Sequence, residues 1–206
     1  MTTFYLIRHG ENDWIGRRLP GWSTGVHLNE HGRAQALALV GVLRPVRFAA
    51  IYTSHLDRAR ETAAPLGRAR RLRPRMRPAL ADPHPGRWQG QPLASLRRRR
   101  YWSVIERTPS QARFPGGESF LEVQARVVVQ LETIARHHGG RRTAVACFTH
   151  GDPIRLAVAY YLGLPIDLFQ RIVVEPASIT VLHVADGRAA LARLNDTRAG
   201  ELVRRG

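Results

Sequence analysis

The segment that decides the fold is Phe4-Tyr5-Leu6-Ile7, which runs directly into Arg8-His9-Gly10-Glu11. Four apolar residues in a row, without alternation and soon followed by a glycine, are typical of a strand buried on both faces. Residues 50–53 and 143–149 repeat this form. We therefore expect three buried strands, each leading into polar residues where it ends.

Helical segments separate these strands. Apolar positions recur at helical spacing from Leu28 to Leu43, where Asn29 is placed to cap the helix, and from Phe120 to Ile134. A further helix is expected over residues 93–107, and two or three strands between Arg171 and Leu194. Strands that alternate with helices predict an α/β protein, a three-layer sandwich whose mostly parallel central sheet has helices on both faces.

Short polar patterns predict helix ends and side-chain pairs. Ser54-His55-Leu56-Asp57 has the spacing of a capping box, and Asp152-Pro153 has the pattern of an N-cap followed by a proline at the first helical position. Glu122 and Arg126 form an i,i+4 pair in the favourable order. We expect these local patterns to decide where the helices begin.

The composition limits the class of protein. The chain has 206 residues, of which 44% are hydrophobic and 23% charged, and this excludes a disordered chain. Its one cysteine, Cys147, excludes a disulfide framework and a cysteine-based zinc site. No apolar run approaches the roughly 20 residues of a membrane span, so we expect a cytoplasmic protein that binds no membrane.

The basic residues have two explanations. All 32 basic side chains are arginine, and with 16 acidic residues they give a net charge of +16. Arginine binds phosphate and carboxylate with two N–H groups at once, which favours an anionic ligand. A GC-rich genome would also favour arginine and alanine codons over lysine codons. Composition alone leaves both explanations open.

Two histidines and two arginines occur where the predicted strands end. Arg8 and His9 follow the first strand, Arg58 lies in the first turn of the helix after the second, and His150 follows the strand 143–149. Ligands of such sheets bind beyond the carboxyl ends of the strands. Arginines and helix N-termini favour phosphate, and a histidine among them can act as a nucleophile or carry a proton. These side chains predict phosphoryl chemistry in a cationic pocket.

The same residues resemble the motifs of the histidine phosphatase superfamily, which includes the cofactor-dependent phosphoglycerate mutases. The resemblance extends from about residue 3 to residue 196. It rests on five motifs in chain order: Arg8-His9-Gly10-Glu11, Gly21-Trp22-Ser23 with residues 28–36, residues 53–63, residues 115–119 and residues 149–155. A phosphoglycerate mutase-like fold is what this resemblance implies.

The resemblance also implies roles for the residues. His9 would attack phosphorus and become phosphohistidine, which water then hydrolyses. Arg8, Arg58 and His150 would hold the phosphoryl oxygens and stabilise the charge of the transition state. Neighbouring arginines would keep His9 neutral, as a nucleophile must be. No metal and no other cofactor is implied.

Two positions depart from the family's pattern. The family has a glutamate as proton donor shortly before a Gly-x-Trp-x-Gly motif, and here Asp82 occupies that place. An aspartate can do the same chemistry but its carboxyl reaches about one methylene less far. His84 and Asp152 are the alternative proton donors. Ile15 follows Trp14, where relatives with the fuller RHGxxxWN pattern have asparagine, and we expect Asn12 to supply the missing phosphate contact.

The predicted function is that of a metal-independent phosphatase. We expect a single domain over residues 1–206 with a cap-like insertion at about residues 82–117. Mutases of this family resemble one another in a longer middle segment and in an asparagine after the second His-Gly, whereas this chain has His150-Gly151-Asp152. A phosphoglycerate mutase is the alternative.

A small phosphorylated molecule is the expected partner, with Arg97 to Arg100 either recognising it or forming a solvated helix face. A basic nucleic-acid-binding protein is an alternative of a different class, although no nucleic acid is expected, because no motif that binds DNA or RNA is present. A non-catalytic relative is another alternative. Association into a homodimer is left open.

Overall fold

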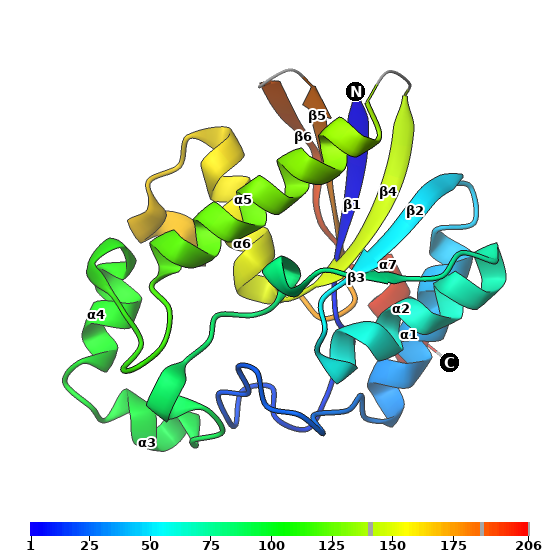
Figure 1. Ribbon diagram of the computed structural model, residues 1–206. Helices are drawn as coiled ribbons and strands as arrows, with labels where there is room; N and C mark the ends of the chain where they lie inside the picture. Colours follow the sequence, from blue (N-terminus) through cyan, green and yellow to red (C-terminus); the bar gives the residue numbers. More distant parts are fainter. Residues whose placement is uncertain (140–141, 186–187, 206) are drawn as a thin grey trace.

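The computed structural model describes residues 1–139, 142–185 and 188–205 of the chain (Figure 1). The strands are β1 (Thr2–Arg8), β2 (Phe48–Thr53), β3 (Arg75–Met76), β4 (Thr143–Thr149), β5 (Ile179–Ala185) and β6 (Arg188–Asp196). The α-helices are α1 (Glu30–Val42), α2 (Asp57–Arg70), α3 (Leu93–Arg97), α4 (Trp102–Arg107), α5 (Phe120–His137), α6 (Gly151–Leu162) and α7 (Arg198–Arg205). Short 3-10 helices are η1 (Pro78–Leu80), η2 (Gly86–Trp88), η3 (Pro109–Gln111) and η4 (Ile166–Arg171).

The described strands form one sheet in the order β3-β2-β4-β1-β5-β6. Strands β1, β2, β3 and β4 run parallel, whereas β5 is antiparallel to both β1 and β6. The register places Arg8 of β1 opposite Thr149 of β4, and Thr53 of β2 opposite Phe148. The carboxyl ends of the three central strands therefore lie at one edge of the sheet.

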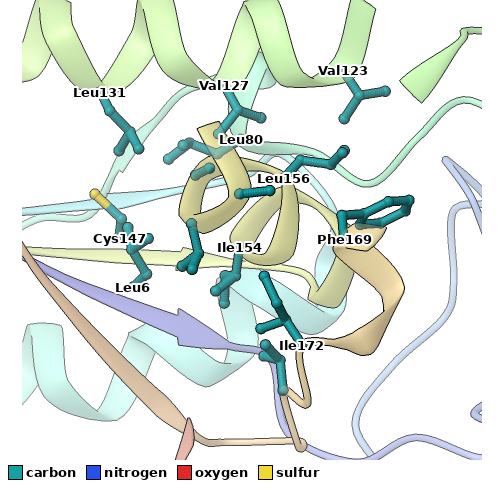
Figure 2. Packing of buried hydrophobic residues seen from close by; sticks show 14 of the residues in the cluster. Leu6, Leu80, Val123, Val127, Leu131, Cys147, Ile154, Leu156, Phe169 and Ile172 are labelled. Atoms are coloured by element: carbon teal, nitrogen blue, oxygen red, sulfur yellow. The ribbon is translucent and has the colours of Figure 1, made fainter. Parts of the chain in front are cut away.

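Helices cover both faces of the sheet (Figure 1). On one face, Ile7 of β1 belongs to a buried cluster with Leu39 of α1, to which α2 and α7 also contribute. On the other face, Leu6 belongs to a cluster with Val127 of α5 and Leu156 of α6 (Figure 2). Successive strand residues thus bury opposite faces. The predicted three-layer sandwich with a mostly parallel sheet is confirmed.

Cys147 lies in the middle of this core. It pairs with Leu6 of β1 on one side and with Tyr52 of β2 on the other, and none of its surface is exposed. Burial raises the pKa of its thiol, because an apolar environment disfavours the thiolate. Cys147 is therefore a packing residue and no nucleophile.

The predicted helix over residues 93–107 is wrong, because two short helices, α3 and α4, replace it. The break falls at Arg98–Tyr101, directly after Leu96 has reached the core. Arg97 to Arg100 are all exposed. Repulsion between consecutive guanidinium groups and the lack of an apolar residue to anchor them explain the break. Farther along, residues 171–194 contain strand β5 and most of strand β6, which agrees with the two or three strands predicted there.

Candidate active site

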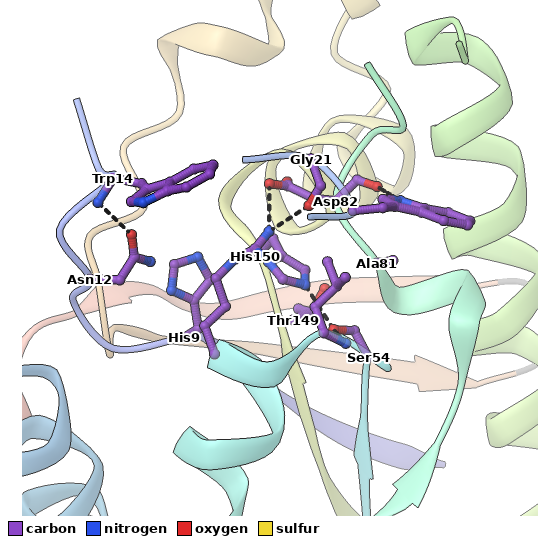
Figure 3. Close-up of polar contacts among 12 residues, drawn as sticks. His9, Asn12, Trp14, Gly21, Ser54, Ala81, Asp82, Thr149 and His150 are labelled. Atoms are coloured by element: carbon purple, nitrogen blue, oxygen red, sulfur yellow. Dashed lines mark hydrogen bonds and ion pairs between the residues drawn. The ribbon is translucent and has the colours of Figure 1, made fainter. Parts of the chain in front are cut away.

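The ends of β1, β2 and β4 bring His9, Ser54 and His150 together (Figure 3). The backbone N–H of His9 donates to the carbonyl of Thr149 at 3.0 Å, and that of Ser54 donates to the carbonyl of Phe148 at 3.0 Å. The parallel ladder thus continues one residue past β1 and β2. It places His9 and Ser54 on either side of the end of β4, where His150 follows.

His9 is a buried, neutral imidazole. Its Nδ1 lies 2.7 Å from the carbonyl oxygen of Gly10, and because a carbonyl can only accept, Nδ1 carries the proton. The pKa of His9 is lowered well below its ordinary value by burial, then by the charges of Arg58 and Arg8. The lone pair of Nε2 is therefore free to attack an electrophile.

His150 lies beside His9, with 5.1 Å between the ring centroids. Its Nε2 is 2.8 Å from the hydroxyl oxygen of Ser54, and its buried Nδ1 has no hydrogen-bond partner among the described residues. Burial, Arg58 and His9 lower its pKa, so this ring is also neutral. The predicted capping box is wrong: α2 begins at Asp57, and Ser54 instead orients His150.

Two arginines lie against these imidazoles. Arg58 is fully buried, and its Nη2 donates to the carbonyl of Gly21 at 3.0 Å and to Oδ2 of Asp82 at 3.3 Å. Arg8 donates from Nη1 to the carbonyl of Val174 at 2.6 Å. Each guanidinium group is thus held by a backbone carbonyl, while other N–H groups on it stay unused.

Buried polar atoms without a hydrogen-bond partner mark a site for an anion. Eight buried side-chain nitrogen or oxygen atoms of the described residues have no hydrogen-bond partner, and five of them belong to four predicted site residues. These five are Nε of Arg8, Nδ2 of Asn12, Nε and Nη1 of Arg58, and Nδ1 of His150. Buried polar groups are nearly always paired, so such a cluster fits a ligand with several oxygens, such as a phosphoryl group.

The carboxyl group of Asp82 lies at the edge of this cluster, 3.3 Å from Arg58. Its pKa is raised to about 6 by burial, which outweighs the opposing charge of Arg58 and is reinforced by the carboxylate of Asp152. A carboxyl with this pKa is partly protonated near neutral pH. It can therefore give a proton to a leaving group and take one back from water.

The alternative proton donors have other partners. Nδ1 of His84 accepts a hydrogen bond from the backbone of Gly86 at 3.2 Å. Asp152 is paired with Arg155 at 3.1 Å. The prediction that Asp152 is an N-cap and Pro153 the first helical residue is wrong, because α6 already begins at Gly151 and the residue before it, His150, is the N-cap.

The loop after β1 packs tightly against α1 and α2. A Cβ atom on Gly10 would lie 2.7 Å from the carbonyl oxygen of Gly32, which is closer than van der Waals contact allows. The N–H of Gly10 donates to the hydroxyl of Thr62 at 3.0 Å, and that hydroxyl donates to the carbonyl of Arg58 at 2.7 Å. Thr62 thus links the loop that carries His9 to the helix that carries Arg58.

Local patterns in the sequence missed Arg126 and Glu118. The predicted i,i+4 pair is wrong: Glu122 caps its own helix with Ser119 and pairs with Arg113, while Arg126 pairs with Glu118 at 2.7 Å. Arg126 also binds the backbone of Asp82. Glu118 lies in a quoted motif, but no short-range pattern connects it with a residue eight positions later.

The fold and this site define the class of the protein, an α/β enzyme of phosphoryl-group chemistry. The sequence model of the histidine phosphatase superfamily (branch 1) matches residues 4–197, and the chain belongs to this family. This confirms the predicted resemblance. The protein is therefore an enzyme of the histidine phosphatase superfamily.

Similar proteins cover almost the whole chain. Phosphoserine phosphatase 1 from Hydrogenobacter thermophilus is 28% identical over 204 residues, which are 96% of this chain and 93% of that protein. A Photorhabdus laumondii protein described as probable phosphoglycerate mutase GpmB is 30% identical over 184 residues, covering 87% and 84%. The solved structure of Bacillus stearothermophilus YhfR superposes with a TM-score of 0.89 at 30% identity, covering 97% of this chain and 100% of that one. This match confirms the phosphoglycerate mutase-like fold.

The described residues lack the side-chain cluster of a metal site and a membrane-spanning helix. They contain no group of three or more His, Cys, Asp or Glu side chains that could hold a metal ion. No helix among them is long and apolar enough to cross a membrane.

Proposed function

We propose that the protein is a metal-independent phosphomonoesterase that works through a phosphohistidine at His9. The observation that carries this proposal is the pairing of Nδ1 of His9 with Gly10, which leaves Nε2 as a nucleophile beside a cluster of buried donors. Arg8 and Arg58 supply there the positive charge that a metal ion supplies in other phosphatases.

In the first half-reaction, the lone pair of Nε2 of His9 attacks phosphorus and forms a P–N bond. The P–O bond to the leaving group breaks in line, and Asp82 gives its proton to the departing oxygen. Arg8 and Arg58 stabilise the negative charge of the three phosphoryl oxygens during the transfer.

The second half-reaction returns the enzyme to its first state. The carboxylate of Asp82 now takes a proton from water, and the water oxygen bonds to phosphorus. The P–N bond breaks, its electron pair returns to Nε2 of His9, and inorganic phosphate leaves. Asp82 is again protonated, so neither proton nor electron pair is left over.

The middle of the chain would serve as a cap within one domain of residues 1–206. Residues 82–117 include α3 and α4, and they contact the loop that follows β1: Leu19 donates to Gln91 at 3.0 Å and Gly90 to Leu19 at 2.8 Å. A cap attached to the loop of His9 would cover a small substrate and exclude bulk water.

The names of the relatives suggest which esters to test first. One is named for phosphoserine and another for phosphoglycerate, and both compounds are phosphate esters of three-carbon acids. The second name also makes mutase activity the alternative function. In a mutase the phosphoryl group of His9 would return to a substrate hydroxyl instead of passing to water.

The test is a panel of phosphate esters that includes phosphoserine and 3-phosphoglycerate, assayed in EDTA with the protein, with His9→Ala and with His137→Ala. The last variant changes an exposed histidine as a matched control. We expect phosphate release by the protein and the control, and none by His9→Ala. Activity that requires added metal, or that survives in His9→Ala, would overturn the mechanism.

The same preparation tests the alternatives. Conversion of 3-phosphoglycerate to 2-phosphoglycerate after priming with 2,3-bisphosphoglycerate would show a mutase. Salt-dependent binding of nucleic acid by a preparation without phosphatase activity would favour a nucleic-acid-binding protein.

A further inference from the structure

We propose that Arg126 and Glu118 are positioning residues, which hold the backbone around Asp82 at the one place from which its short side chain can reach the leaving group. This inference rests on the proposed role of Asp82 as proton donor. It concerns residues of α5 and of the turn before it, which do not belong to the cluster of phosphate-binding donors.

Every N–H group of Arg126 is already used. Two N–H groups bind the carboxylate of Glu118, from Nε at 2.7 Å and from Nη2 at 2.9 Å. The other three donate to backbone carbonyls: Nη1 to Ala79 and to Ala81, both at 2.8 Å, and Nη2 to Asp82 at 2.9 Å. A guanidinium group has five N–H donors, so none is left for a phosphoryl oxygen. Arg126 therefore acts through the backbone that it holds.

Glu118 fixes the other side of the same segment. Its Oε2 accepts from the backbone N–H of His84 at 2.8 Å, and its own N–H donates to the carbonyl of His84 at 2.9 Å. Together with Arg126, it holds the chain before, at and after Asp82. The bidentate pairing keeps the two side chains rigid with respect to each other.

This support replaces secondary structure. Asp82 lies in an irregular stretch between η1 and η2, where no strand or helix is described. The carbonyls of residues 79–82 instead all accept from side chains, because Thr149 donates to Leu80 at 2.6 Å and Trp22 donates from Nε1 to Asp82 at 2.7 Å. A backbone held in this way has one defined position.

The position matters because the acid is an aspartate. With one methylene fewer than glutamate, the carboxyl of Asp82 follows any movement of its backbone and has little torsional freedom to correct it. A misplacement of about 1 Å can cost roughly 100-fold in rate. Loss of the support from Arg126 should therefore slow the step in which the leaving group needs a proton.

The test compares two similar esters. Phenyl phosphate has a poor leaving group that needs the acid, whereas the leaving group of 4-nitrophenyl phosphate departs without much help. The ratio kcat/KM is measured because it reports the step in which the ester bond breaks. Arg126→Lys keeps the charge and loses the planar arrangement of donors. Arg136→Lys, at an exposed position of the same helix, is the matched control.

We expect Arg126→Lys to lower kcat/KM for phenyl phosphate by about 10-fold to 100-fold, and for 4-nitrophenyl phosphate by less than about 3-fold. Arg136→Lys should change neither value. Combined with Asp82→Asn, Arg126→Lys should cause no further loss on phenyl phosphate, because the acid that it positions is gone. An equal loss on both esters, or a loss that persists beside Asp82→Asn, would overturn the inference.

Two measurements keep the outcomes distinct. If thermal denaturation shows that Arg126→Lys fails to fold, Trp22→Phe is tested in its place. This variant removes one hydrogen bond to the backbone carbonyl of Asp82, which Arg126 also binds. It should lower kcat/KM by a smaller factor, again for phenyl phosphate more than for 4-nitrophenyl phosphate. If Asp82→Asn alone affects both esters equally, the proposed role of Asp82 fails and the inference fails with it. If Asp82→Asn is selective and both Arg126→Lys and Trp22→Phe are not, only the inference fails.

Discussion

Replacing Asp82 by asparagine should make the protein more stable at neutral pH. The pKa of this carboxyl is raised from 3.8 to about 6, so the fold prefers its neutral form although Arg58 lies 3.3 Å away. Asparagine has the shape of that neutral form and cannot ionise. The variant therefore removes the cost of a half-buried carboxylate that the active site requires.

The magnitude follows from the shift in pKa. Because the folded state binds this proton more tightly than the unfolded state, the native protein loses stability as the pH rises from about 4 to about 6. The Asp82→Asn variant keeps its stability over this pH range, because its asparagine cannot ionise. At 1.36 kcal/mol per pKa unit, the advantage of the variant should be about 1–2 kcal/mol at pH 5 and about 3 kcal/mol at pH 8.

Urea denaturation at pH 5 and at pH 8 measures this difference. Asp167→Asn serves as the control, because the carboxylate of Asp167 accepts from Ser110 at 2.7 and 2.9 Å and lies on η4. That variant should lose about 1 kcal/mol at both pH values. If Asp82→Asn is less stable than the native protein at pH 8, the carboxyl does not have a raised pKa, and the reason for choosing it as the acid is refuted.

Three further predictions concern the same site. Ser54→Ala removes the hydrogen bond to His150 and should lower kcat/KM for phenyl phosphate by about 10-fold, as one lost buried hydrogen bond does, in a steady-state assay. Gly10→Ala forces a Cβ against Gly32 and should lower the free energy of unfolding by about 1–3 kcal/mol, measured with urea. The pH profile of kcat/KM for phenyl phosphate should fall above about pH 6 as Asp82 loses its proton, whereas the profile for 4-nitrophenyl phosphate should not show this limb.

The sequence alone was enough to predict the central sheet and the residues at its edge. Buried parallel strands need unbroken apolar segments, and their ends must coincide at one edge, so a polar residue directly after such a strand has a known location. This is how Arg8, His9 and His150 could be placed together before their contacts were known. Arg58 could be placed at the same edge because it lies in the first turn of the helix that follows the second strand.

Contacts between distant residues could not be predicted in this way. Ser54 has the spacing of a helix cap. Its hydroxyl instead forms a hydrogen bond with His150, which is 96 positions away in the sequence. Arg126 could pair with Glu122 one turn earlier, yet five hydrogen bonds toward Glu118 and the segment of Asp82 are worth more. Local patterns describe neighbours within about four residues, so they cannot predict hydrogen bonds with residues far away in the sequence.

Because Cys147 is buried at the centre of the sheet, the rate at which its thiol reacts can report global unfolding. This thiol is the only one in the chain, and strands β1 and β2 flank it on both sides. A thiol reagent can reach it only after the centre of the sheet has separated, since partial fraying at the ends leaves it covered. The rate of alkylation in native buffer thus follows global unfolding without any engineered label. Substrate analogues that slow this reaction can be ranked by how strongly they hold the folded state.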